Sequence, residues 1–215
     1  MKILVAGFER FPGVDSNPTE TGVRSVDQWA KTNGSIELVA EVLPVEFESA
    51  GRRIVELVDQ VKPSAVICFG VAAGSLAFLL ERCARNMDDA VIPDNAGAMP
   101  STQVIVPSGP ATYSSSLPLN AIHHQLQKTD FPVEFSDDAG AYVCNHVFYV
   151  ACHELAVRSL QIPCGFIHVP LPVPPEMDDG ASMDSIVEAM KICVMVTEEE
   201  LRRRNPSAGE MLDLA

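Results

Sequence analysis

The sequence predicts an α/β protein, a three-layer α/β/α sandwich whose central sheet is mixed and mostly parallel. Two short apolar runs, residues 3–6 before Gly7 and residues 65–69 before Gly70, have the continuous hydrophobicity of strands that are covered on both faces. Helical patterns alternate with such runs along the chain, which is the order expected when helices join the strands of one sheet across both of its faces.

The first half of the chain alternates strands with helices. A helix is expected after Asn17-Pro18-Thr19, because asparagine caps helix N-termini and proline fits the first turn. A strand is expected over residues 36–43. A second amphipathic helix is expected through Ile54 and Val61, where apolar residues recur at helical spacing.

The second half continues the alternation and ends in a long helix. The expected elements are a helix near residues 117–128, a strand near 133–135, a helix over 145–160, a strand over 166–169 and a helix over about 184–204. In the last helix three glutamates at 198–200 precede three arginines at 202–204 by four residues, the favourable orientation for helical ion pairs. We interpret this charge run as a solvated face.

Two stretches show neither the helical spacing of apolar residues nor the pattern of a strand. Residues 85–116 form a long irregular segment, and such a loop inside a compact domain is usually functional or disordered. Within it, Val104 to Val106 are expected to form a short strand or hairpin. Residues 170–183 are rich in proline and predict a surface loop.

Composition limits the possible partners. The chain of 215 residues has no linker-like stretch, so we expect a single domain over residues 1–215. A net charge of −14 without a basic stripe argues against nucleic acids and anionic membrane surfaces. No export signal and no apolar run long enough for a membrane span are visible, and the six cysteines show no zinc-site spacing. We therefore expect a cytoplasmic protein with reduced thiols, no metal and no cofactor.

Cys144 is the strongest candidate for a reactive group. It lies where a loop is expected to turn into a helix, and the partial positive charge of a helix N-terminus favours a thiolate. The alternative is packing, since free cysteine is among the most buried residue types. We assign Cys68, Cys152 and Cys193 to packing because they lie inside apolar runs, while Cys83 and Cys164 stay undecided.

Two further residues fit a cysteine nucleophile. His168 ends an apolar strand, at the sheet edge where open α/β folds commonly locate their sites, although a satisfied core histidine is an equal alternative. His146 is the weaker base, because side chains two apart on a helix point away from each other. Glu81 is the candidate for fixing the imidazole, and its alternative is an ordinary salt bridge with the adjacent Arg82.

Several separated motifs together resemble the pyroglutamyl peptidase I family, also called pyrrolidone carboxyl peptidases. The matching stretches, which span residues 3 to about 172, are Gly7-Phe8-Glu9-Arg10-Phe11-Pro12-Gly13, Asn17-Pro18, Glu81-Arg82, Asn86, Ile92-Pro93-Asp94-Asn95-Ala96-Gly97, Tyr142-Val143-Cys144-Asn145-His146 and Gly165-Phe166-Ile167-His168-Val169-Pro170. The resemblance implies a cysteine peptidase that removes an N-terminal 5-oxoproline from peptides. It also implies a homo-oligomer, a dimer or a tetramer.

By the same resemblance, Cys144 is the nucleophile, His168 the general base and acid, and Glu81 the orienting carboxylate. The expected substrate-binding residues are Phe8, Phe11, Tyr142, Val71 and Val143. A flat, neutral lactam needs apolar walls and a few amide partners, which the three aromatic rings fit, although core packing is the alternative for each of them.

The chain departs from the family pattern at two places. Val91 stands where the family typically has an arginine, and the family's Gly-rich segment is here Gly70-Val71-Ala72-Ala73-Gly74-Ser75. Less electrostatic support for the oxyanion is expected from these changes. They motivate the alternative of a diverged, non-catalytic or weakly active lactam-binding homologue. A weaker alternative is a nucleoside phosphorylase or hydrolase of similar architecture.

Overall fold

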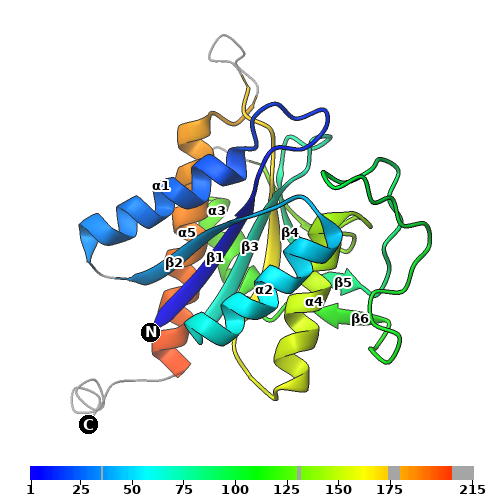
Figure 1. The fold of residues 1–215 in the computed structure, drawn as a ribbon. Helices are drawn as coiled ribbons and strands as arrows, with labels where there is room; N and C mark the ends of the chain where they lie inside the picture. The colour runs from blue at the N-terminus through cyan, green and yellow to red at the C-terminus, as the bar shows by residue number, and fades with distance from the viewer. Residues whose placement is uncertain (35, 130–131, 174–179, 205–215) are drawn as a thin grey trace.

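The computed structural model describes residues 1–34, 36–129, 132–173 and 180–204 and contains one large sheet in the order β2-β1-β3-β8-β4-β7 (Figure 1). Its strands are β1 Lys2–Phe8, β2 Glu37–Leu43, β3 Ala65–Val71, β4 Phe78–Glu81, β7 Val133–Ser136 and β8 Cys164–Val169. The strands β2, β1, β3 and β8 are parallel neighbours, while β4 runs antiparallel to β8 and parallel to β7. The mixed, mostly parallel sheet is therefore confirmed.

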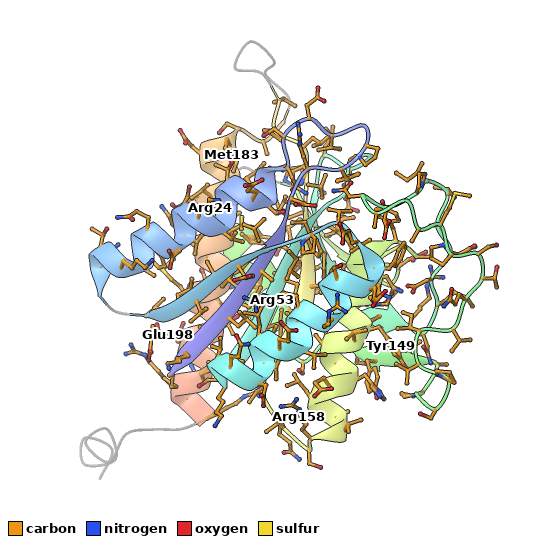
Figure 2. All side chains as sticks on the ribbon, in the orientation of Figure 1. Arg24, Arg53, Tyr149, Arg158, Met183 and Glu198 are labelled. Carbon is orange, nitrogen blue, oxygen red and sulfur yellow. The ribbon has the colours of Figure 1, made fainter. Side chains whose placement is uncertain are left out.

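Helices cover both faces of this sheet, as the buried strands require (Figure 1). The helices are α1 Pro18–Asn33, α2 Phe47–Val61, α3 Leu119–Leu126, α4 Val143–Val157 and α5 Met183–Arg204. α1, α3 and α5 pack on one face, and α2 and α4 pack on the other. Alternate residues of one strand serve the two cores: Ile3 faces the first set of helices and Leu4 the second. Side chains lie between the sheet and the helices on each of its two faces (Figure 2).

Local signals work as expected at α1 and α5. Asn17 caps α1, its Oδ1 accepting from the Thr19 amide at 3.0 Å, and the helix ends at Gly34 in the left-handed conformation. In α5 the arginines at 202–204 pair with the glutamates four residues earlier. None of the helices in the described residues is long and apolar enough to cross a membrane.

One strand in the middle of the chain was not predicted, and one expectation there needs correction. Phe78–Glu81 form the short strand β4, inserted between β8 and β7, where the sequence pattern gave no strand. Val104 to Val106 form no strand, because the backbone of Val106 bonds instead to the side-chain amide of Asn86, with both distances 2.8 Å. The ladder in this region joins β5 Cys83–Arg85 to β6 Thr112–Ser114. In the second irregular stretch, residues 174–179 lie outside the described residues.

Candidate active site

Cys144 is the second residue of α4, so the expected loop-to-helix junction is confirmed. The N-cap residue Tyr142 gives the helix no side-chain cap, and the first helical hydrogen bond runs from the His146 amide to the Tyr142 carbonyl at 3.1 Å. The backbone amides before His146 in this first turn, including that of Cys144, therefore have no acceptor within the helix and point out of its N-terminal end. Together with the helix dipole they give the thiol a positive electrostatic surrounding.

Gly70 provides the space that the thiol occupies. It lies on β3 directly beside His168 of β8. A Cβ atom at Gly70 would lie 2.9 Å from Cys144 Sγ and 2.7 Å from two ring carbons of Phe166. Contacts that short do not occur between real side chains. The strand therefore needs glycine here so that the sulfur can approach the sheet.

His168 is held by a buried carboxylate. Its Nδ1 lies 2.7 Å from Oε1 of Glu81, which is 0% exposed, while His168 itself is 6% exposed. Glu81 is two positions along β4 from Leu79, the residue paired with His168, so the two side chains are diagonal neighbours on one face of the sheet. The alternative salt bridge does not form, because Arg82 pairs with Asp137 instead.

The charge state of His168 follows from these contacts. Burial lowers its pKa, but hydrogen bonds to Cys144 and Glu81 and the charges of both partners outweigh that effect and raise the pKa to about 9. Since Nδ1 faces Glu81, the remaining ring nitrogen, Nε2, is the one that serves Cys144. Near neutral pH the imidazole is therefore a cation held between a sulfur and a carboxylate.

A cavity of about 350 Å³ opens beside these three groups. Every residue expected for the site lines it: Cys144, His168, Glu81, Phe8, Phe11, Tyr142, Val71 and Val143. The structure thus brings together side chains from β1, β3, β4, β8, the β1–α1 loop and the start of α4. Its walls are mainly apolar, which suits a small neutral ligand.

The aromatic walls differ in burial. Phe8 is 2% exposed and packs against Phe166 at a centroid distance of 6.1 Å, so it serves the core as well as the cavity. Phe11 and Tyr142 are half-buried with ring centroids 6.3 Å apart, and Tyr142 meets Phe47 edge-on at 5.4 Å. Burial, with the nearby Asp94 and Cys144, raises the pKa of Tyr142 to about 12, so its hydroxyl stays a donor, here to the Pro93 carbonyl at 3.0 Å.

Comparisons with known proteins show the family of this chain. A sequence model of the pyroglutamyl peptidase family matches residues 1–200. This chain belongs to the pyroglutamyl peptidase family. It is 43% identical to a pyrrolidone-carboxylate peptidase of Oceanobacillus iheyensis over 79% of this chain and 83% of that protein. It is 36% identical to the pyrrolidone-carboxylate peptidase of Pyrococcus furiosus over 94% of this chain and 100% of that protein.

Solved structures of pyroglutamyl peptidases share the fold. A mutant pyrrolidone carboxyl peptidase from P. furiosus superposes with a TM-score of 0.86 at 35% identity, covering 94% of this chain and 100% of that chain. Pyroglutamyl peptidase I of Bacillus amyloliquefaciens gives a TM-score of 0.85 at 32% identity, covering 93% of this chain and 98% of that chain.

The two departures from the pyroglutamyl peptidase pattern lie in different surroundings. Val91 is 93% exposed and is absent from the cavity lining, so its side chain does not border the space beside Cys144. The altered segment after Gly70 does reach the cavity, where Val71, Ala72 and Ala73 add apolar surface.

Sequence reasoning missed several lining residues. These are Asn17, Val45, Ala72, Ala73, Leu79, Asp138, Ala139 and Gly140. The last three form the loop before α4, and their position just upstream of Cys144 was the available signal. Asn17 was recognised as a helix cap and as part of a matching stretch, but not as a lining residue. Its side-chain amide donates to the Glu9 carbonyl and accepts from the Thr19 backbone amide.

The other cysteines and His146 lie away from this cavity lining. Cys68, Cys152 and Cys193 are buried, in agreement with packing, and Cys164 is buried with its sulfur 3.8 Å from that of Cys152. His146 bonds through Nδ1 to the buried carboxylate of Asp88 at 2.7 Å. No cluster of potential metal ligands occurs in the part of the chain that the structure describes.

Proposed function

We propose that this protein is a cysteine-type pyroglutamyl peptidase, an omega peptidase that hydrolyses the bond after an N-terminal 5-oxoproline through a thioester. The observation that carries the proposal is the imidazole of His168, held between the Cys144 thiol and the buried Glu81 carboxylate at the edge of an apolar cavity. Membership of the pyroglutamyl peptidase family supports the choice of substrate.

In the acylation step Cys144 reacts as a thiolate and His168 as an imidazolium. The sulfur of Cys144 attacks the pyroglutamyl carbonyl, and the S–C bond forms as the carbon becomes tetrahedral. Amides of the first turn of α4 stabilise the oxyanion, since the helix does not use them. His168 then gives its proton to the departing amine nitrogen, the C–N bond breaks, and the thioester remains.

Deacylation uses one water molecule. The now neutral His168 takes a proton from the water as its oxygen attacks the thioester carbonyl, and the C–S bond breaks to release free 5-oxoproline. Glu81 keeps Nδ1 protonated throughout, so that Nε2 is always the nitrogen that exchanges protons. Phe8, Phe11, Tyr142, Val71 and Val143 enclose the lactam ring.

The cellular setting belongs to the same proposal. We expect a cytoplasmic enzyme, which is supported by six cysteines that are all free thiols. We expect peptides with N-terminal pyroglutamate as substrates and a dimer or tetramer in solution. Light scattering of the purified protein tests the oligomeric state directly.

The deciding experiment is release of a chromophore from a pyroglutamyl amide, compared with a proline amide that lacks the lactam carbonyl. The wild type should cleave only the lactam substrate, and Cys144→Ser should be inactive while keeping its circular dichroism spectrum. Equal turnover by Cys144→Ser would exclude the assigned nucleophile. Binding of the pyroglutamyl amide without cleavage by the wild type would instead identify a lactam-binding homologue.

A further inference from the structure

The long loop between β5 and β6 is fastened to the segments that carry the aromatic walls of the cavity. Asn95 makes the central contacts. Its amide donates to the Val45 carbonyl at 2.9 Å, and its side-chain Nδ2 donates to Glu9 Oε1 at 2.8 Å and to the Arg10 carbonyl at 2.9 Å. Glu9 and Arg10 connect the end of β1 to Phe11, so the side chain of Asn95 holds the short segment that leads to the Phe11 ring.

The neighbours of Asn95 fasten the loop to the opposite wall. The Pro93 carbonyl accepts the Tyr142 hydroxyl at 3.0 Å. Asp94 is buried, and its Oδ2 accepts the Phe47 amide at 2.9 Å, while Phe47 packs against Tyr142. Residues 93–95 therefore connect the Phe8–Phe11 side of the cavity to the Tyr142 side.

We propose that Asn95 is a positioning residue of the lactam pocket, which holds the Glu9–Arg10 segment so that Phe11 and Tyr142 stand at the right spacing before substrate arrives. The identity of the ligand, a five-membered lactam, rests on the proposed function. A pocket formed in advance binds more tightly, because the ordering cost of the loop is not subtracted from binding. Asn95 is itself exposed and does not line the cavity, so its effect on binding is exerted through Glu9 and Arg10.

The test variant is Asn95→Asp, which keeps the shape but replaces the donor by a carboxylate facing Glu9. We expect KM for a pyroglutamyl amide to rise about tenfold and kcat to change less than about twofold, because substrate binding is affected and the reacting groups are not. The dissociation constant of 2-pyrrolidone, the bare lactam, should rise by the same factor. Alkylation of Cys144 by iodoacetamide, which needs no lactam pocket, should keep its rate.

Two controls separate positioning from general stability. Asn33→Asp changes an exposed asparagine whose Nδ2 donates to the Trp29 carbonyl of its own helix, and it should leave KM unchanged. In the double variant Glu9→Gln with Asn95→Asp, the side-chain amide at position 9 can donate to the carboxylate at position 95, so the hydrogen bond is restored in the opposite direction. This variant should recover part of the lost affinity. A drop in kcat, alkylation rate and melting temperature together would mean that Asn95 is only structural.

The inference and the proposed function fail in different ways. If the wild type does not cleave the pyroglutamyl amide but Asn95→Asp still weakens 2-pyrrolidone binding, the proposed function is wrong and the role of Asn95 stands. If the wild type cleaves the amide and Asn95→Asp leaves KM and the 2-pyrrolidone dissociation constant unchanged, Asn95 has no positioning role. A wild type that binds no 2-pyrrolidone overturns the inference as well.

Discussion

The exchange Glu81→Gln tests the electrostatic part of the site without changing its shape. In the wild type His168 Nδ1 lies 2.7 Å from Oε1 of Glu81. The side-chain oxygen of glutamine can still accept this hydrogen bond, so the imidazole keeps its orientation. What is lost is the negative charge, in a place that is 0% exposed and therefore little screened by water.

The structure gives the direction and scale of the effect. The pKa of His168 is raised from 6.5 to about 9 despite burial, which corresponds to roughly 3 kcal/mol in favour of the cation. Cys144 and Glu81 supply this preference, so losing the Glu81 charge should move the alkaline limb of kcat from about pH 9 to lower pH by roughly 1 to 2 pH units. The value of kcat should fall about a hundredfold to ten-thousandfold.

The same exchange should appear in the pH dependence of stability. Because the folded pKa of His168 lies above its ordinary value, the charged imidazolium stabilises the fold fully below about pH 6.5, and this contribution is lost as pH rises through about 9. The melting temperature of Glu81→Gln should therefore be furthest below that of the wild type near pH 6, where the carboxylate and the imidazolium are both charged, and should approach it as pH rises through about 9. Glu134→Gln, on the exposed face of β7, is the matched control.

The assay is a pH profile of kcat with a chromogenic pyroglutamyl amide, recorded for the wild type and both variants. An alkaline limb that stays near pH 9 in Glu81→Gln would refute the reasoning, because Glu81 would then contribute nothing to the charge of His168. An equal shift in Glu134→Gln would also refute it, since the effect would then come from net charge alone.

Three further predictions follow from the packing around the site. Gly70→Ala should lower kcat at least about a hundredfold while far-ultraviolet circular dichroism stays unchanged, because the added methyl would lie 2.9 Å from Cys144 Sγ; normal turnover would contradict this. Asn145→Ala should lower the free energy of unfolding by about 3 kcal/mol in urea titrations, since this buried amide bonds to Arg85 twice and to Met87 once. Val91→Arg should change kcat and KM less than about twofold, because the side chain is 93% exposed outside the cavity lining; a large gain in rate would show that position 91 reaches the oxyanion.

The parts of the fold that the sequence predicts are those with a strong local cause. The strands β1, β3 and β8 are continuous apolar runs because both of their faces are buried, and this leaves a clear pattern. The start of α1 is marked by Asn17 and Pro18, whose chemistry is specific to helix N-termini. The helical spacing after Cys144 predicted the loop-to-helix junction, although α4 begins two residues earlier than the expected residue 145.

The parts that were missed depend on distant partners. β4 has only four residues and ends in Glu81, so nothing local separates it from a loop closed by a salt bridge. Val104 to Val106 have the composition of a strand, but Asn86, from the far end of the loop, takes up the backbone groups of Val106. Where a side chain substitutes for a neighbouring strand, propensity alone gives the wrong answer.

The site itself follows from strand alternation once the order of the strands is known. On β8, Phe166 and His168 point to the face covered by α4, while Ile167 and Val169 point to the other face. On β4, Leu80 belongs to the opposite core, so Glu81 shares the α4 face with His168. On β3, Gly70 stands on this same face and leaves the gap that the sulfur occupies. A one-residue shift of β4 would turn Glu81 away from His168, so the register of this four-residue strand is the most consequential feature that no local pattern predicts.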